Sequence, residues 1–215
     1  MAIIKAVLFD LDGVLVDATE WHYEAFNRAL GLFGFTITRY EHLAIYNGLP
    51  TRKKLAMLTV EKGLPEGLHS LISRLKQIYT IEEIGAKCHP IFDKEYMIAR
   101  LRQEGCRLAV CSNSVRETVE AMVRRSGIYD HFEFLLSNED VTRAKPDPEM
   151  YVKAIARLGC DPDQAVIVED APHGIEAAKK SGAHVCEVSG WLDVDYTRIR
   201  NFIDKVERRQ VAVNQ

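Results

Sequence analysis

Two acidic residues stand directly after the first apolar run of the chain. Asp10 and Asp12 follow residues 6–9, Ala-Val-Leu-Phe, a run typical of a buried strand. Side chains of a strand repeat with a period of two, so the two carboxylates are expected to point the same way. Neighbouring like charges raise each other's pKa and need a positive partner, most often a divalent cation. The pair therefore predicts a metal-dependent site; a solvated polar strand end is the simpler alternative.

Three more polar clusters follow along the chain, each after another strand-like run. Ser112 and Asn113 follow residues 107–111, and Lys145 lies in a Lys-Pro-Asp-Pro loop beyond the run at 134–137. Glu169 and Asp170 end the apolar run 165–168. Ligands of an open parallel sheet bind at the carboxyl ends of its strands, so the four clusters are expected to form one site.

In order and spacing, these clusters resemble the four motifs of the haloacid dehalogenase superfamily over nearly the whole chain. One Asp-x-Asp-Gly segment alone is a weak indication, whereas four motifs in order, each behind its own strand, are a strong one. The resemblance implies an α/β fold, a Rossmann-like, doubly wound parallel sheet core with an inserted α-helical cap domain. The core is expected over residues 1–16 and 87–215 and the cap over residues 17–86.

The local patterns agree with this organisation. From residue 86 onward, strand and helix patterns alternate with short connections, whereas residues 17–86 show apolar residues at helical spacing and no convincing strand. Thr51 to Lys62 reads as a helix stopped by Gly63. Ser114 and Glu117 have the spacing of a capping box, which predicts a helix beginning there.

The resemblance assigns a role to each core residue. Asp10 is the expected nucleophile, forming an aspartyl-phosphate, and Asp12 the general acid and then the base that activates water. Ser112 and Asn113 are expected to donate hydrogen bonds to the phosphoryl group, and Lys145 to supply a cation. A solvated loop lysine is the alternative for Lys145, although the flanking prolines fix its loop.

A Mg²⁺ site is the second implication of the resemblance. The expected ligands are Asp10, the backbone carbonyl of Asp12, and Asp170, with Glu169 binding directly or through water. Helix capping is the alternative role for the acids at 169 and 170.

The expected cap contributes candidate substrate-binding residues. Residues 17–22 are similar to the segment that leads into the cap of β-phosphoglucomutases, where the residue matching His22 faces the reaction centre. Thr51 and Arg52 begin a predicted helix and are candidates for contacts with another polar part of the substrate; a charged surface helix start is the alternative. Ala18 and Asn47 differ from the mutase pattern, because a threonine and a basic residue are expected there, and this favours a phosphatase.

Composition narrows the class of protein further. The 215 residues are 47% hydrophobic and 27% charged, as in an ordinary globular protein. The net charge of -3 gives no positive electrostatic potential that would attract nucleic acid or an anionic membrane. The five cysteines form no C-x-x-C pair, as expected of reduced thiols in a cytoplasmic protein. The apolar start is interrupted by Lys5 and Asp10 and reads as a strand, not as a signal peptide or membrane span.

These observations lead to one main hypothesis and two alternatives. We expect a monomeric, Mg²⁺-dependent phosphatase that hydrolyses a small phosphorylated metabolite, a sugar phosphate, through an aspartyl-phosphate. A β-phosphoglucomutase-like phosphoryl transferase is the first alternative. A catalytically silent binding module is the second, and it gives no reason to keep like charges together.

Overall fold

The computed structural model describes residues 4–213 of the chain. Its described residues divide into two compact units, a sheet unit of residues 4–17 and 89–213 and a helical unit of residues 18–88. Each unit has its own hydrophobic core.

The sheet unit contains five parallel strands in the order β3-β2-β1-β4-β5. The first strand lies in the centre and is buried along its whole length, which is why it reads as an unbroken apolar run. This order confirms the predicted Rossmann-like parallel sheet. The strands are β1 (Ala6–Phe9), β2 (Arg107–Cys111), β3 (Phe134–Leu136), β4 (Ala165–Glu169) and β5 (His184–Glu187).

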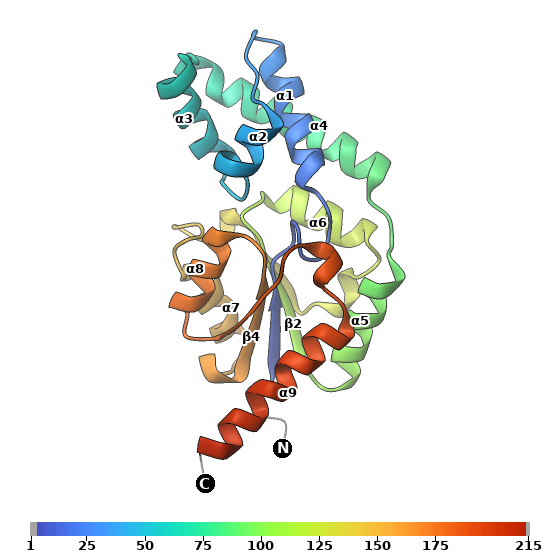
Figure 1. Ribbon diagram of the computed structural model, residues 1–215. Coiled ribbons are helices and arrows are strands. Elements are labelled where there is room, and N and C mark those ends of the chain that lie inside the picture. The colour runs from blue at the N-terminus through green and yellow to red at the C-terminus, as the bar shows by residue number, and fades with distance from the viewer. Residues whose placement is uncertain (1–3, 214–215) are drawn as a thin grey trace. The chain divides into compact units, whose positions relative to one another are not determined.

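Helices cover both faces of this sheet, as Figure 1 shows with α7 and α8 on one side and α5 and α9 on the other. Residues of α7 and α8, among them Tyr151 and Ala177, share one core cluster with Leu8 of β1 and Ala109 of β2. Parallel strands need such cover because both of their faces are apolar. The helices are α5 (Phe92–Gln103), α6 (Arg116–Arg125), α7 (Glu149–Arg157), α8 (Pro172–Lys180) and α9 (Tyr196–Val213).

The helix predicted to begin near Ser114 is α6, which begins at Arg116 after Val115. Val115 makes no side-chain capping hydrogen bond. The hydroxyl of Ser114 donates to Asp12, a tertiary contact that the sequence did not predict.

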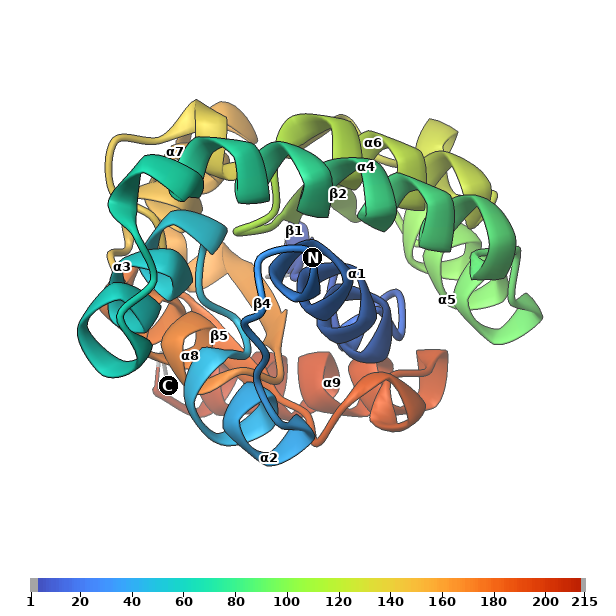
Figure 2. The ribbon, with the colours of Figure 1, turned by 90° about the horizontal axis from the view of Figure 1, so that it is seen from above.

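The helical unit consists of four α-helices, a π-helical turn and a short 3₁₀ helix (η2, Glu66–Leu68), and its residues 18–88 contain no strand. In this unit α1 packs along α4, and Figure 2 shows the four helices from above. Its core includes Phe26, Leu30, Leu55, Leu58 and Ile72. The elements are α1 (Thr19–Gly31), α2 (Arg39–Glu41), the turn η1 (His42–Tyr46), α3 (Thr51–Lys62) and α4 (His69–Lys87).

The bounds of α3 agree with the sequence prediction, which placed this helix between Thr51 and Lys62. The next residue, Gly63, has φ 71° in the left-handed region, where glycine avoids the strain that a Cβ would cause.

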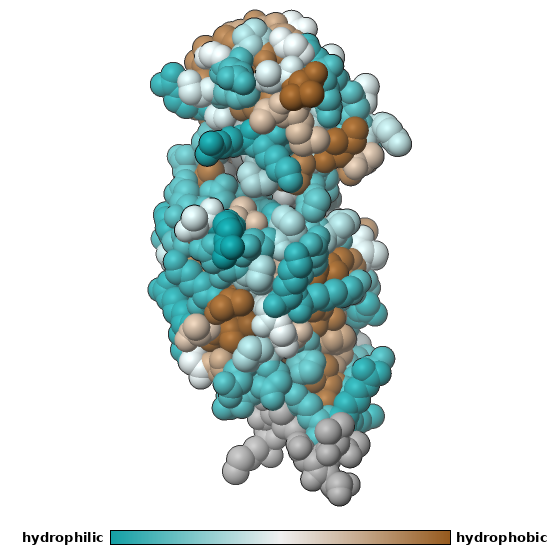
Figure 3. Space-filling model, turned by 90° about the vertical axis from the view of Figure 1, so that its left-hand side faces the viewer, coloured by the Kyte–Doolittle hydropathy of each residue, from teal (hydrophilic) through white to brown (hydrophobic). Residues whose placement is uncertain are grey.

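The polar surface agrees with the 27% of charged residues, and the state of the thiols agrees with the lack of a C-x-x-C pair. Figure 3 shows a largely hydrophilic face with scattered apolar patches. All five cysteines are free, as expected of reduced thiols, and Cys111 and Cys186 are buried residues of β2 and β5. No helix within the described part of the chain is both long and apolar enough to cross a membrane.

Candidate active site

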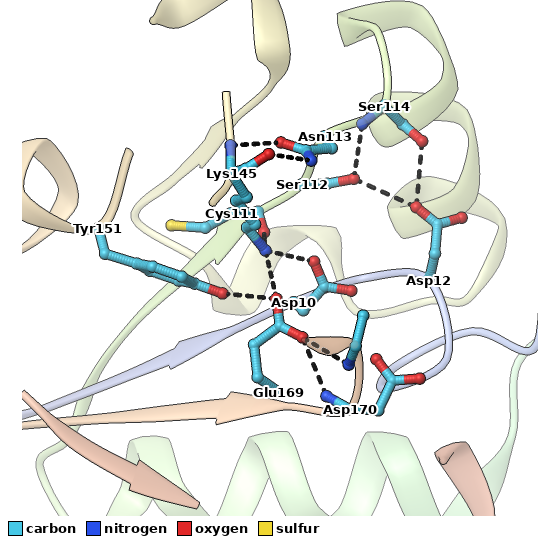
Figure 4. Close-up of polar contacts among 11 residues, drawn as sticks. Asp10, Asp12, Cys111, Ser112, Asn113, Ser114, Lys145, Tyr151, Glu169 and Asp170 are labelled. Carbon is cyan, nitrogen blue, oxygen red and sulfur yellow. Dashed lines mark hydrogen bonds and ion pairs between the residues drawn. The ribbon is translucent and has the colours of Figure 1, made fainter. Parts of the chain in front are cut away.

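Lys145 lies at the centre of a buried ion cluster at the carboxyl ends of the strands (Figure 4). Its Nζ donates hydrogen bonds to Oδ1 of Asp10 at 2.5 Å, to Oε1 of Glu169 at 2.6 Å and to the carbonyl oxygen of Cys111 at 2.9 Å. Only 4% of Lys145 and 1% of Glu169 is exposed. The predicted loop lysine is therefore joined to residues from three strands and is not a solvated surface group.

The carboxylate of Glu169 is held by four donors. Its Oε1 accepts from Lys145 and from the hydroxyl of Tyr151 at 2.9 Å, and its Oε2 accepts from the backbone amides of Asp170 and Ala171 at 2.9 and 3.1 Å. Ala171 is the residue before α8, and its side chain makes no capping hydrogen bond. Its amide donates to the carboxylate of Glu169, which therefore lies at the N-terminal, positive end of the helix dipole. A Cβ on Gly174 would lie 1.6 Å from Oε1, so only glycine leaves room for it.

Asp12 is bound by two hydroxyl groups from the loop after β2. Its Oδ2 accepts from Ser112 at 3.2 Å and from Ser114 at 3.1 Å, and the amide of Ser114 donates to the hydroxyl of Ser112 at 3.0 Å. The structure therefore brings Ser112 into contact with Asp12, and it adds Ser114, which the sequence analysis did not place in the site.

Asn113 holds the loop that carries Lys145. Its Oδ1 accepts from the backbone amide of Lys145 at 3.1 Å, and its Nδ2 donates to the carbonyl oxygen of Lys145 at 3.4 Å. The peptide bond between Lys145 and Pro146 is cis. The amide side chain of Asn113 thus supports the position of the lysine, in addition to the substrate contact expected from the sequence.

Burial and crowding perturb the charges of the cluster. Burial and the nearby Glu169 raise the pKa of Asp10 well above its usual range, against the opposing effect of Lys145. Burial acts to lower the pKa of Lys145, but attraction to Asp10 and Glu169 outweighs it and raises that pKa. Burial and Glu169 also raise the pKa of Asp170 to about 7. One lysine therefore faces more negative charge than it can neutralise.

The acidic residues fit a Mg²⁺ ion. One carboxylate oxygen from each of Asp10, Glu169 and Asp170 lies within 4.8 Å of the others. Oδ1 of Asp170 is buried and has no hydrogen-bond partner among the residues that the structure describes. Gly13, with φ 89°, leaves room for Asp170, because a Cβ there would lie 2.2 Å from Oδ2. A set of oxygen donors with an unsatisfied buried oxygen suits a hard divalent cation.

The predicted substrate-binding residues His22, Thr51 and Arg52 belong to the helical unit. Nδ1 of His22 on α1 lies 3.2 Å from Nζ of Lys76 on α4. Thr51 is the first residue of α3, and Arg52 is exposed beside it. Lys54, two residues further on, is only 7% exposed. Sequence reasoning missed Lys76 and Lys54, since a single lysine in an amphipathic helix reads as part of a solvated face.

The sequence model of the family described as haloacid dehalogenase-like hydrolase matches residues 7–188. That range contains all the site residues of the sheet unit and most of the chain. The chain therefore belongs to the haloacid dehalogenase-like hydrolases.

Individual relatives agree with this assignment. The chain is 28% identical over 186 residues to the phosphorylated carbohydrates phosphatase of Thermotoga maritima, covering 83% of this chain and 82% of the relative. It is 31% identical over 214 residues to protein CbbY of Cereibacter sphaeroides, covering 93% and 88%. The crystal structure of β-phosphoglucomutase from Clostridium difficile superimposes with a TM-score of 0.81 at 19% identity, covering 94% of this chain and 98% of the other, and shows the shared fold.

Proposed function

We propose that this hydrolase is a Mg²⁺-dependent phosphatase that cleaves a small phosphorylated metabolite, a sugar phosphate, through an aspartyl-phosphate. The observation that carries the proposal is the buried contact of Lys145 with Asp10, with Asp12 held apart from it by hydroxyl groups. Asp10, paired with the Lys145 cation, is positioned for nucleophilic attack. Asp12, held by the two hydroxyl groups, is positioned for proton transfer. The 28% identity to a phosphorylated carbohydrates phosphatase supports the choice of substrate class.

Each residue has a separate part in this reaction. Asp10 attacks the phosphorus atom in line, and Lys145 balances the charge that builds up on the transferring group. Asp12 protonates the departing alcohol oxygen and then removes a proton from the water that hydrolyses the aspartyl-phosphate. With substrate bound, the single O–H of Ser112 donates to a phosphoryl oxygen in place of Asp12, and Asn113 keeps the lysine loop in place.

Asp10, the backbone carbonyl of Asp12 and Asp170 are the proposed Mg²⁺ ligands, with Glu169 binding directly or through water. When bound, the ion supplies positive charge that polarises the phosphate and offsets the repulsion among these acids. The buried Oδ1 of Asp170 supports this assignment, because a buried polar atom without a partner is costly.

The helical unit is proposed as the cap that recognises the rest of the substrate. His22, Thr51 and Arg52 are its candidate contacts. We further propose that the enzyme is a cytoplasmic monomer whose partner is a small phosphate ester, with neither nucleic acid nor membrane involved. The net charge of -3 supports the exclusion of polyanions.

A β-phosphoglucomutase-like transferase is the second candidate. Asn47 and Ala18 count against it, since a mutase must hold a second phosphate with cap cations. The helical unit nevertheless contains other cationic groups, namely Lys76 beside His22 and the buried Lys54. The lack of a basic residue at position 47 therefore counts less strongly against a mutase. The silent-module alternative is disfavoured by the cost of burying three neighbouring acids without use.

A turnover experiment separates these candidates. The wild type and Asp10→Asn are incubated with a panel of sugar phosphates, with Mg²⁺ or a chelator, and free phosphate is measured. Phosphate release that needs both Mg²⁺ and Asp10 supports the phosphatase. In a second arm, β-glucose 1-phosphate and a trace of the 1,6-bisphosphate are supplied. Formation of glucose 6-phosphate much faster than free phosphate would instead establish the mutase.

A further inference from the structure

Tyr151 of α7 touches two members of the ion cluster at once. Its side chain is completely buried, and its hydroxyl donates to Oε1 of Glu169 at 2.9 Å. Nζ of Lys145 lies over its ring, 4.7 Å from the ring centroid. Figure 4 shows the tyrosine reaching toward the lysine and the glutamate from the side opposite Asp12.

These contacts leave the lysine ammonium little freedom. An ammonium has three N–H donors, and those of Lys145 are accounted for by Asp10, Glu169 and the carbonyl of Cys111. The electron-rich face of the Tyr151 ring attracts the same positive charge. The lysine is thus held by hydrogen bonds to its oxygen acceptors and by the ring.

The hydroxyl of Tyr151 fixes the acceptor that Lys145 uses. Oε1 of Glu169 receives both Lys145 and Tyr151, while Oε2 receives two amides at the start of α8. Without the hydroxyl, Oε1 would lose one of its two donors and would draw the lysine more strongly away from Asp10. A phenylalanine would fill the same core space, so packing alone does not explain the hydroxyl.

We propose that Tyr151 is a positioning residue, whose hydroxyl and ring together hold the Lys145 ammonium against Asp10. Its effect on turnover rests on the proposed phosphatase function, whereas its effect on the lysine itself does not. Tyr151 acts through Lys145 and Glu169 and not by direct contact with the reacting atoms.

The test compares Tyr151→Phe, which keeps the ring, with Tyr151→Leu, which removes both ring and hydroxyl. Tyr46→Phe is the matched control, because Tyr46 is also fully buried and its hydroxyl donates to a glutamate, Glu61, at 2.5 Å in the helical unit. Three quantities are measured for each protein: thermal unfolding, kcat and KM for the best ester, and the NMR signals of the Lys145 side chain in metal-free protein. The Lys145 signals are assigned by their loss in Lys145→Arg.

Tyr151→Phe is expected to lower kcat about tenfold with little change in KM, the equivalent of one hydrogen bond to a charged group. In Tyr151→Phe the ring-current shift of the Lys145 side-chain protons should persist, but the Nζ signal should move, because Oε1 of Glu169 has lost a donor. In Tyr151→Leu the ring-current shift should also vanish, and kcat should fall by about 100-fold. Tyr46→Phe should lose stability without moving the lysine signals.

Two results would overturn the proposal. One is an unchanged Lys145 Nζ signal together with wild-type kcat in Tyr151→Phe. The other is a loss of activity in the three variants that simply follows their loss of thermal stability. If the wild type hydrolyses no ester, the proposed function fails, but the Nζ signal in Tyr151→Phe still decides whether the hydroxyl positions Lys145.

Discussion

The hydroxyl of Ser114 donates to Oδ2 of Asp12 at 3.1 Å, and its backbone amide donates to the hydroxyl of Ser112 at 3.0 Å. Ser114 thereby connects the loop after β2 to the second acid of the loop after β1. Because Ser112 also donates to Asp12, both hydroxyls hold the same carboxylate oxygen. An acid that must exchange a proton with substrate and with water benefits from such fixed orientation.

Ser114→Ala is expected to lower kcat about tenfold with little effect on KM, because one of the two hydroxyl donors to Asp12 is lost. Asp12→Asn should cost about 10² to 10⁴ in rate, as for the loss of a proton-transfer group. Steady-state kinetics measure both. Ser126→Ala is the control, since this buried hydroxyl donates to the carbonyl of Met122 in α6 and not to the site. Wild-type kcat in Ser114→Ala would contradict the role given to Ser114.

Asp10→Asn is expected to abolish phosphate release and leave the fold intact. The amide lacks the attacking oxygen, while burial and Glu169 already make the charge of Asp10 unfavourable in the metal-free protein. Thermal unfolding of the metal-free variant should therefore show no loss of stability. Phosphate assays and trapping of a hydroxylamine-sensitive phosphoprotein provide the measurement. Substantial turnover by the variant would refute Asp10 as the nucleophile.

The sequence predicted the backbone positions of the site better than its side-chain contacts. Asp10 and Asp170 were located because each follows an unbroken apolar strand, and parallel strands bring their carboxyl ends together. Lys145 was located by its proline-flanked loop and by family resemblance. Strand ends and a proline-flanked loop are defined by short, continuous segments, so a single sequence is enough to predict them.

The contacts that were missed join residues from different parts of the chain. The hydroxyl of Ser114 donates to Asp12, which lies 102 positions earlier. The hydroxyl of Tyr151 on α7 reaches Glu169 at the end of β4 only in the folded chain. Lys76 and His22 are 54 positions apart, so their proximity depends on how α4 packs along α1.

Mg²⁺ is expected to raise the melting temperature of the wild type at pH 7.5 and to do so much less in Asp170→Asn. Burial and Glu169 raise the pKa of Asp170 to about 7, so its ionised form destabilises the metal-free fold at that pH. The stabilisation from the protonated acid is complete below about pH 4 and is lost as the pH rises through about 7. In the metal-free Asp170→Asn variant, the stability of the fold should therefore not decrease through the ionisation of residue 170 as the pH rises through about 7.

Differential scanning calorimetry over pH 4–8, with Mg²⁺ or a chelator, measures these effects. Asp163→Asn serves as the control, because this exposed acid lies outside the cluster. An equal rise in melting temperature with Mg²⁺ in the wild type and in Asp170→Asn would exclude Asp170 as a ligand.

Gly174→Ala is expected to displace Glu169 and impair the site, since the added Cβ would lie 1.6 Å from Oε1. Gly85→Ala in α4 is the matched control, because a Cβ there meets nothing within 4 Å. The control should be as stable as the wild type or more stable by about 0.5–1 kcal/mol, from helix propensity. Unfolding and phosphate release are measured for both. Full activity in Gly174→Ala would show that Glu169 need not keep its observed position.

His42 is expected to make the helical unit less stable as the pH falls from 7 to 4. Its ring is completely buried, and burial, with repulsion from Lys54 and His22, lowers its pKa to about 4. In the unfolded chain a histidine protonates near pH 6.5, so protons favour unfolding. The stability that depends on neutral His42 is fully present above about pH 6.5 and is lost as the pH falls through about 4.

His42→Phe keeps an aromatic ring beside Tyr23 and removes the titration. The fall in unfolding free energy between pH 7 and pH 4 should be smaller in this variant by roughly 3 kcal/mol at most. Trp21 fluorescence, recorded in a Trp191→Phe background, follows the helical unit alone, because the two tryptophans lie in different units. His89→Gln, which changes an exposed ring, is the control. An identical pH dependence in His42→Phe and its parent would show that the buried His42 does not control the acid stability of this unit.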